Sequence, residues 1–397
     1  MAMESGLGRY ECHTCGGHLS HIAGFPDFLQ VTSDCRPWKA QGNLAICQVC
    51  GTVQKPVTEA WLAEAEAIYG GYEIYSQSGG VEQSAFDQLT GAAQSRSAKL
   101  VDWLTRGGHI PLEGKLLDIG CGNGAFLRAF GSVYPNWSMT GLELNDRNQA
   151  AVESIPGVES FHVGPVESLP SQFNLITLIH ALEHIPRPSH FLRTLKEKLL
   201  PGGMVIIEVP NLKTSPFDIL IADHCTHFTT DTLGKVIEQA PLAVVQLEED
   251  YVPKELTVAI KSGEAVIDFA PQPKEENLDS ADLENSQILT AHLDYLQSLL
   301  DLANSVSGPI GIFGTSIAGT WLAQSVRDKV AFFVDEDPNR IGRYHLEKPI
   351  VSPDRVADGS KVLIPLPPAI ASDVANRLSY LNCEFLLPSG LNLKVNA

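Results

Sequence analysis

The chain has 397 residues, of which 44% are hydrophobic and 19% charged, so it can bury a large core and, at roughly 100 to 200 residues per domain, should form two or three units. It carries 28 Lys and Arg against 47 Asp and Glu, a formal charge of −19, which repels nucleic acids and anionic membranes and excludes both as expected partners. No apolar run approaches the roughly 18 residues of a membrane span, and the start, MAMESGLGRYECHTC, lacks the regions of a signal peptide. We therefore expect a cytoplasmic protein.

Cysteines cluster near the N-terminus. Two Cys-x-x-Cys pairs, Cys12 with Cys15 and Cys47 with Cys50, are each followed by a glycine that permits a tight turn. This pattern predicts a four-thiolate structural zinc site, with reduced structural thiols as the alternative, and four thiolates leave no coordination position for a substrate. Four nearby side chains are spare ligands: His13, His18, His21 and Cys35.

The zinc-binding unit is predicted to span residues 1–70. Residues 59 to 69 have the apolar spacing of a helix, and the stretch GGYEIYSQSGG then interrupts the pattern near Gly70. A second helix is predicted from about residue 84 to 107, leading into the strand-like run KLLDI.

A central unit, residues 71–262, alternates short apolar runs with helical stretches. The predicted strands are 115–119, 139–144, 161–163, 174–179, 205–209, 242–247 and 256–260. This alternation is typical of an α/β fold with a doubly wound parallel sheet.

A Pro-, Ser- and acid-rich stretch at 263–284 is predicted to be a linker. A helix follows that carries Leu283, Ile288, Leu293, Leu296 and Leu300, and from Pro309 the runs GPIGIF, VAFFVD and KVLIPL repeat the strand–helix alternation. Residues 285–397 therefore form a second, smaller Rossmann-like α/β unit.

The first predicted strand of the central unit runs directly into the loop GCGNG. Its glycines let the backbone turn sharply and let a ligand lie against bare peptide at a helix N-terminus. Asp118 precedes the loop, and Glu143 closes the next strand, where an acid can accept both ribose hydroxyls of an adenosine. Ala125 stands where a dinucleotide site more often has its third glycine. Because alanine is sometimes allowed there, the spacing does not exclude NAD, which remains an alternative.

The segments LLDIGCGNG, GLELN, VESLP and NLITLIHALEHI, in this order, resemble class I S-adenosylmethionine-dependent methyltransferases over about residues 85 to 260. The resemblance implies a methyl-donor site. It assigns the methionine end to Asp118, Gly120 and Gly122, the ribose to Glu143, the adenine to Glu167 and Ser168, and the wall beside the methyl group to His180. Methyl transfer from a sulfonium also needs a group that removes the acceptor's proton.

The cysteine-rich head, the segment YGGYEIYSQSGGVEQ with Tyr72 and Tyr75, and the second α/β unit together resemble the sugar C-methyltransferases of deoxysugar biosynthesis. The resemblance implies a 4-keto sugar nucleotide that loses its C3 proton and accepts the methyl group as an enolate. It assigns the chemistry to His184 and His227. The two tyrosines are candidates for substrate contact, with packing under the zinc-binding unit as an equal alternative.

The chain departs from that family at both histidine segments. His180 replaces an Asn, and the run His224-Cys225-Thr226-His227 replaces a Tyr-x-Glu-His run. An O-methyltransferase acting on a sugar or another polar hydroxyl is therefore the alternative. His224 and His227 lie three positions apart, which places them on one side if this stretch is a helical turn. His224 is therefore a third candidate base.

The C-terminal unit repeats the pattern of glycines followed by an acid. Gly311, Gly314 and Gly319 follow a predicted strand, and Asp335 ends the next one. By resemblance, Gly314 and Asp335 would hold the nucleotide half of the sugar donor, with a purely structural role as the alternative. Two hypotheses from other classes stay open, an NAD-dependent oxidoreductase and a non-catalytic protein that binds zinc and S-adenosylmethionine.

Overall fold

The computed structural model describes residues 11–38, 42–82, 84–86, 93–108, 110–263 and 279–388. Most of the predicted linker, residues 264–278, lies outside this part of the chain. Its end is helical, because helix α7 (Asp279–Ser305) already begins there. Within the described ranges, no helix has both the length and the apolar composition needed to cross a bilayer.

The central unit is built on a seven-stranded sheet with the order β10-β9-β8-β11-β12-β15-β14. All seven predicted strands are confirmed. Their bounds are β8 Gly114–Ile119, β9 Trp137–Glu143, β10 Val158–Val163, β11 Phe173–Ile179, β12 Leu199–Pro210, β14 Leu242–Glu249 and β15 Glu255–Ser262. The expectation of an all-parallel sheet is wrong for β15, which pairs antiparallel with both of its neighbours. A short turn joins β14 to β15, and such a turn permits only antiparallel pairing.

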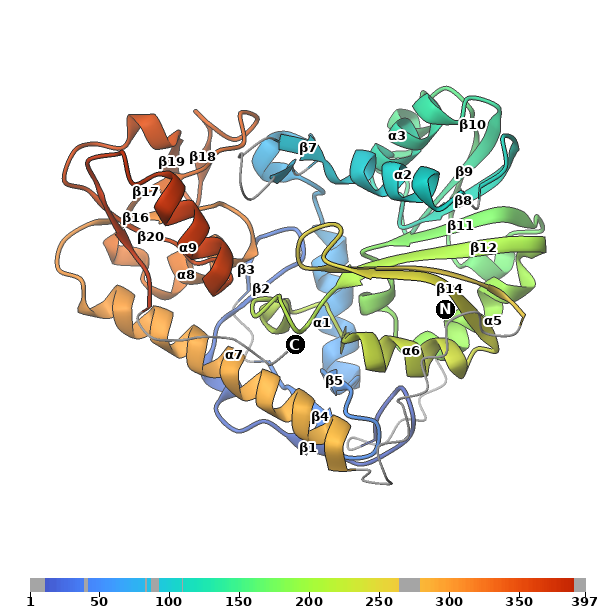
Figure 1. The fold of residues 1–397 in the computed structure, drawn as a ribbon, viewed down its shortest axis with the longest axis horizontal. Coiled ribbons are helices and arrows are strands. Elements are labelled where there is room, and N and C mark those ends of the chain that lie inside the picture. Colours follow the sequence, from blue (N-terminus) through green and yellow to red (C-terminus); the bar gives the residue numbers. More distant parts are fainter. Residues whose placement is uncertain are drawn as a thin grey trace.

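Helices cover both faces of this sheet (Figure 1). They are α2 Arg96–Gly107, α3 Ala125–Val133, α4 Gln149–Glu153, α5 Pro188–Glu197 and α6 Thr230–Glu238. Helices α2, α3 and α4 pack with Leu116 of β8, whereas α5 and α6 pack with Leu117, because successive strand residues point to opposite faces. The helix predicted from residue 84 begins instead at Arg96, where the Ser95 hydroxyl caps it, and strands β6 (Ser84–Phe86) and β7 (Ala93–Ser95) precede it.

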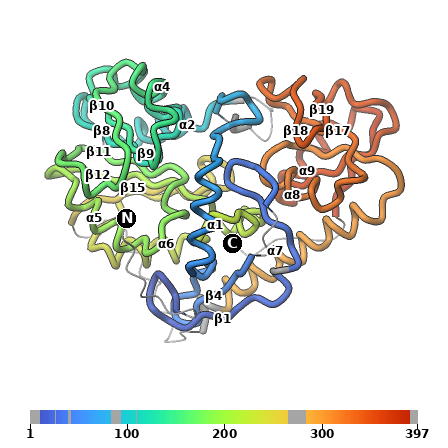
Figure 2. Tube along the Cα trace, turned by 180° about the vertical axis from the view of Figure 1, so that it is seen from behind, coloured from blue at the N-terminus to red at the C-terminus, as the bar shows by residue number. Residues whose placement is uncertain are grey.

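The N-terminal unit forms a small sheet with the order β1-β4-β5-β13. Its own strands are β1 Leu19–His21, β4 Ala45–Cys47 and β5 Val53–Gln54, and β2 (Gln30–Val31) pairs separately with β3 (Pro37–Trp38). The fourth strand, β13 (Thr226–His227), comes from the central unit. Helix α1 (Glu59–Gly70) confirms the prediction for residues 59 to 69, and it runs between the central and C-terminal units (Figures 1 and 2).

The C-terminal unit is a second α/β sheet with the order β18-β19-β17-β16-β20-β21. Its elements are β16 Ile310–Phe313, α8 Ile317–Ser325, β17 Val330–Val334, β18 Tyr344–His345, β19 Lys348–Val351, β20 Lys361–Leu363, α9 Pro368–Arg377 and β21 Glu384–Leu386. A Cβ atom at Gly319 would lie 2.0 Å from the Gly314 carbonyl oxygen. Helix α8 can therefore pack this closely against the loop before it only with glycine at that position.

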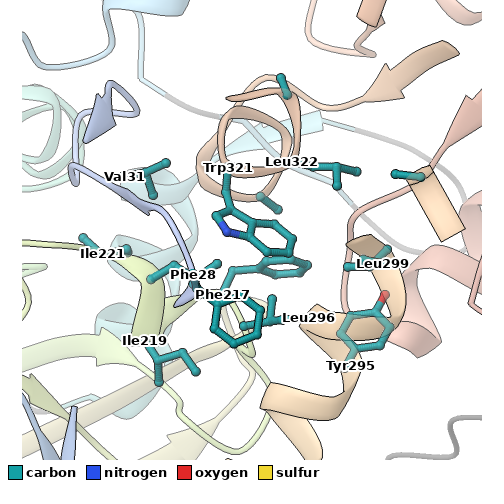
Figure 3. Packing of buried hydrophobic residues seen from close by; sticks show 14 of the residues in the cluster. Phe28, Val31, Phe217, Ile219, Ile221, Tyr295, Leu296, Leu299, Trp321 and Leu322 are labelled. Carbon is teal, nitrogen blue, oxygen red and sulfur yellow. The ribbon is translucent and has the colours of Figure 1, made fainter. Parts of the chain in front are cut away.

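One hydrophobic core joins all three units (Figure 3). The Trp321 ring of α8 lies 6.2 Å from the ring of Phe28 and 6.1 Å from that of Phe217, and Phe217 lies 6.1 Å from Tyr295 of α7. Aromatic rings at these separations attract one another in addition to the burial of their area. The shared core fixes the three units against one another and so fixes the walls of the space between them.

Candidate active site

A central cavity of about 2820 Å³ is lined by residues of all three units. Ligand pockets usually measure roughly 300 to 1,000 Å³. The space is therefore large enough for a nucleoside cofactor and a sizeable second molecule together.

The glycine loop between β8 and α3 forms part of the cavity wall. Gly120 and Gly122 have φ angles of 72° and 53°, in the left-handed region that favours glycine. At Gly122 a Cβ atom would also lie 2.5 Å from the Cδ1 atom of Ile74. The loop can thus approach both a ligand and the segment around Ile74 only with bare backbone.

Glu143 lies at the end of β9 beside this loop. Its Oε1 atom accepts a hydrogen bond of 2.7 Å from the Gly122 N–H, and its Oε2 atom accepts one of 3.1 Å from the Leu144 N–H. Burial raises the pKa of Glu143, and the two N–H donors oppose this effect. The carboxylate is therefore held in a fixed orientation at the cavity wall, where its remaining lone pairs can accept hydroxyl groups.

Asp118 lies on the same wall, at the end of β8, and is only 2% exposed. Its Oδ1 atom accepts a 2.7 Å hydrogen bond from the Thr177 hydroxyl. Burial raises the pKa of Asp118 to about 7, and the nearby charge of Glu143 adds to the effect. A cationic ligand at this position would favour the ionised carboxylate.

The two residues assigned to the adenine lie in the turn Val166–Ser168. Glu167 lines the cavity. The Ser168 hydroxyl instead donates a 2.7 Å hydrogen bond to the Pro165 carbonyl oxygen within the turn. The structure therefore brings Glu167 to the cavity but directs the Ser168 hydroxyl elsewhere.

His180 belongs to a buried charged cluster that the motifs did not predict. Arg96 donates to the His180 Nε2 atom and to the Oε1 atoms of Glu208 (3.3 Å) and Glu255 (3.0 Å), while His180 Nδ1 lies 3.2 Å from Glu183 Oε1. Because a guanidinium only donates, His180 must accept through Nε2 and is neutral. Burial, followed by the charge of Arg96, holds its pKa well below its usual value.

The acids of this cluster are as unusual as its histidine. Burial raises the pKa of Glu183 and of Glu208 to about 7 and that of Glu255 well above its usual value. The sequence does contain one signal, because Glu208 interrupts the apolar strand MVIIEVP. Arg96, His180, Glu208 and Glu255 all line the cavity and make this end of it strongly polar.

His184 and His224 lie together on the cavity wall, with ring centroids 4.5 Å apart and ring planes at 87°. His184 Nδ1 donates a 3.0 Å hydrogen bond to the main-chain carbonyl oxygen of Asp223. A carbonyl oxygen only accepts, so Nδ1 carries the proton and Nε2 keeps its lone pair. Burial, followed by the neighbouring His224, lowers the pKa of His184.

His224 is the more basic member of the pair. Its Nδ1 atom lies 2.7 Å from Asp218 Oδ1. Burial lowers the pKa of His224, but the charge of Asp218 and the hydrogen bond to it outweigh this effect and raise the pKa above its usual value. The wall thus combines an imidazole whose pKa is lowered with one whose pKa is raised by a paired carboxylate.

The structure does not bring His227 to the cavity. Its side chain is fully buried behind Asp218, whose Oδ2 atom lies 2.5 Å from His227 Nδ1. His224 and His227 do not share a helical turn, because His227 lies in strand β13. Both rings nevertheless reach one carboxylate, that of Asp218.

Two predicted substrate residues line the cavity between the N-terminal and central units. Tyr72 and Tyr75 are half-buried there, and burial raises the pKa of both phenols. Tyr75 lies near Arg96 and has a φ angle of 56°.

The other two predicted substrate residues belong to the C-terminal unit and also line the cavity. Gly314, with a φ angle of 84°, leaves open space where a side chain would stand. The Asp335 carboxylate is already engaged, because it accepts from the Thr315 hydroxyl (2.7 Å), Arg340 (3.3 Å) and the Asp337 N–H (3.0 Å).

The four cysteines of the two pairs converge as predicted. The Sγ atoms of Cys12, Cys15, Cys47 and Cys50 all lie within 4.8 Å of one another, and none is in a disulfide. Main-chain N–H groups of the two turns donate to the sulfurs of Cys12, Cys15 and Cys47 at 3.4 Å. Such a set can hold a metal ion tetrahedrally. Cys35 lies apart from it on the cavity wall, and burial raises its pKa to about 12.

Comparison with known proteins agrees with this geometry. Residues 92–247 match a family model described as a methyltransferase domain. Ubiquinone biosynthesis O-methyltransferases of Pseudomonas putida and Pseudomonas syringae pv. tomato are 31% and 29% identical over 120 and 119 residues, which is 28% of this chain. The chain spans 50% of the length of these relatives.

Solved structures align more weakly. A coclaurine N-methyltransferase bound to N-methylheliamine and S-adenosylhomocysteine is 14% identical, with a TM-score of 0.38 over 49% of this chain and 67% of its own. An S-adenosylmethionine-dependent methyltransferase of Clostridium acetobutylicum is 12% identical, with a TM-score of 0.35 over 52% of this chain and 100% of its own. The assignment therefore rests on the family model and the sequence relatives, which favour methyl transfer over nicotinamide chemistry at the first glycine loop. Residues 92–247 of the central unit are therefore similar to S-adenosylmethionine-dependent methyltransferase domains.

Proposed function

We propose that the chain is an S-adenosylmethionine-dependent methyltransferase whose acceptor is a polar small molecule bound in the central cavity. One observation carries the proposal: the glycine loop with Glu143 and the pair His184–His224 line the same cavity. The first can hold the nucleoside of a methyl donor, and the second can handle the acceptor's proton.

Methyl transfer from a sulfonium is an in-line displacement, so the chain must align the acceptor and remove its proton. His184 suits this task, because its Nε2 lone pair is free of the hydrogen bond to Asp223 and its lowered pKa keeps the ring neutral at pH 7. His224, paired with Asp218, can place a positive charge beside oxygen that becomes negative.

Two acceptor classes fit this wall. A hydroxyl needs only the base, and the matched relatives carry the name O-methyltransferase. A 4-keto deoxysugar nucleotide would use both rings, with His184 removing the C3 proton and His224 stabilising the enolate oxygen. Support for this second candidate comes from the base–cation pair and from the volume of the cavity, which exceeds the need of the methyl donor.

The four-cysteine cluster is proposed to hold one structural zinc ion. Its donors, their mutual distances and the N–H groups directed at the sulfurs fit zinc. Bound there, zinc would supply folding free energy and leave no position for a substrate.

A single experiment tests the function and separates the two acceptors. Purified protein is titrated with S-adenosylmethionine and then incubated in deuterated water with nucleotide sugars, some of them 4-keto sugars. A carbon acceptor should exchange its C3 hydrogen for deuterium before methyl transfer, whereas a hydroxyl acceptor should be methylated without exchange. Failure to bind S-adenosylmethionine would refute the proposed function altogether.

A further inference from the structure

The segment that carries His224 is built into the N-terminal sheet. Strand β13 pairs antiparallel with β5, with Thr226 opposite Gln54 and His227 opposite Val53. The pairing continues beyond the strand, because the Lys55 N–H donates a 3.0 Å hydrogen bond to the Cys225 carbonyl oxygen. A strand of two residues gains little stability by itself, so its position depends on the sheet it joins.

Side chains connect this strand to the cysteine cluster on one side. Thr226 Oγ1 and His13 Nε2 share a hydrogen bond of 2.7 Å, and His13 directly follows Cys12. Gln54 accepts from the His13 N–H at 3.1 Å and donates to the Cys12 sulfur at 2.9 Å. Each of these groups is buried, where a lost partner is costly.

Asp218 connects the same strand to the cavity on the other side. It is 2% exposed, and each of its carboxylate oxygens takes the Nδ1 atom of one histidine, Oδ1 that of His224 and Oδ2 that of His227. His227 is fully buried, and within the described residues its Nε2 atom has no hydrogen-bond partner. Among the described residues, Asp218 is therefore the hydrogen-bond partner of the His227 side chain. A shift of His227 would displace the same carboxylate that holds His224.

We propose that Asp218 is the positioning residue of His224 and that, through His227 and Thr226, it makes the N-terminal unit a working part of the acceptor site. The N-terminal unit, which carries the four cysteines, thus holds in place the part of the cavity wall formed by His184 and His224. The residues proposed to bind the methyl donor are held instead by strands β8 and β9. The inference deepens the proposed function and rests on it. Coupling of this kind requires a contiguous path of packed and hydrogen-bonded groups, and the contacts from Cys12 to His224 provide one.

The test measures the ring nitrogens of His224 directly, because these report its tautomer and orientation without any acceptor. Protein labelled with 15N at histidine is compared by NMR as wild type and as Asp218→Asn, Thr226→Val and Thr194→Val, with the His224 signals assigned from a His224→Gln variant. Thr194 lies on α5, where its hydroxyl donates to the His190 carbonyl oxygen of the same helix, so its variant is a matched control for Thr226→Val. Zinc content and affinity for S-adenosylmethionine are measured on each protein.

Asp218→Asn should change the ring signals of both His224 and His227, because an amide offers only one oxygen to two Nδ1 donors. Thr226→Val should shift the His224 signals while Thr194→Val should not, and both should keep their zinc. Affinity for S-adenosylmethionine should stay within twofold in every variant.

The pH titration of His224 should move in Asp218→Asn. The charged and titratable groups that face His224 are Asp218, Asp223, Glu183, His180, His184 and His227, and the variant replaces the first of these alone. Unaltered His224 signals in folded Thr226→Val would refute the coupling to the N-terminal unit, and unaltered signals in Asp218→Asn would refute the positioning role. Because neither readout uses methyl transfer, a failure of the proposed function would show separately, as loss of S-adenosylmethionine binding in the wild type.

Discussion

The Gly122 N–H donates a 2.7 Å hydrogen bond to Oε1 of Glu143, so the acid expected at the ribose also fastens the glycine loop. Glu143→Ala should weaken S-adenosylmethionine binding by at least ~1.5 kcal/mol, about tenfold, because charge-assisted hydrogen bonds are each worth roughly 1.5 to 3 kcal/mol. Isothermal titration calorimetry measures the loss. Glu143→Gln separates the two roles, since it keeps an acceptor for Gly122 but removes the charge. Unchanged affinity in both folded variants would remove Glu143 from the donor site.

Asp118 should link donor binding to pH. Its pKa is raised from 3.8 to about 7 by burial, so below pH 7 the unliganded carboxyl is mostly protonated. A cationic methionine end favours the carboxylate, so affinity should rise as the pH increases through 7, by up to about tenfold per unit, and level off above it. Calorimetry in phosphate and in Tris should reveal a proton released on binding. In Asp118→Asn binding should be weaker and no longer linked to this proton, and equal heats in both buffers for the wild type would contradict the prediction.

The cysteine cluster should hold one zinc ion per chain. Cys12→Ser, Cys15→Ser, Cys47→Ser and Cys50→Ser should each lose the metal and become less soluble, because the affinity of a structural metal is folding free energy. Cys35→Ser is the matched control, since Cys35 lies outside the cluster, and it should keep its zinc. Elemental analysis that finds iron, or no metal in folded protein, would overturn this assignment.

His184→Ala should lower turnover by roughly 10²- to 10⁴-fold, the usual contribution of a general base, while S-adenosylmethionine still binds. His162→Ala, on β10 and outside the cavity lining, is the control. Because the pKa of His184 is lowered from 6.5, the ring stays neutral at pH 6. The kcat/KM for the acceptor, measured at saturating S-adenosylmethionine so that Asp118 does not contribute, should therefore decline only below that pH. A profile that declines through pH 6.5, or full activity in His184→Ala, would place the base elsewhere.

The strands of the central sheet could be predicted because their signals are local. Short apolar runs such as residues 174–179, and a glycine loop directly after residues 115–119, need no distant partner to be recognised. The same holds for the cysteine pairs, whose spacing fixes two tight turns. Only the direction of β15 was predicted wrongly within this sheet, because apolar spacing does not encode strand direction.

The candidate site was less predictable, because tertiary contacts decide it. His224 and His227 look equivalent in sequence, yet one faces the cavity and the other lies behind Asp218. The sequence predicts Arg96 in the middle of a long helix, whereas α2 begins at Arg96. Its guanidinium forms ion pairs with Glu208 and Glu255, which lie on strands more than a hundred positions away. Contacts between residues so far apart produce no periodic pattern in the sequence from which they could be predicted.

The shared core also constrains the order in which the protein can fold during synthesis. Phe28 emerges from the ribosome early, but its partner Trp321 follows almost 300 residues later, after Phe217. At about 5 to 20 residues per second, the N-terminal apolar side chains lack their final neighbours for roughly 15 to 60 s. A nascent chain stalled before α8 should therefore expose them to chaperones, even though the central sheet is already complete.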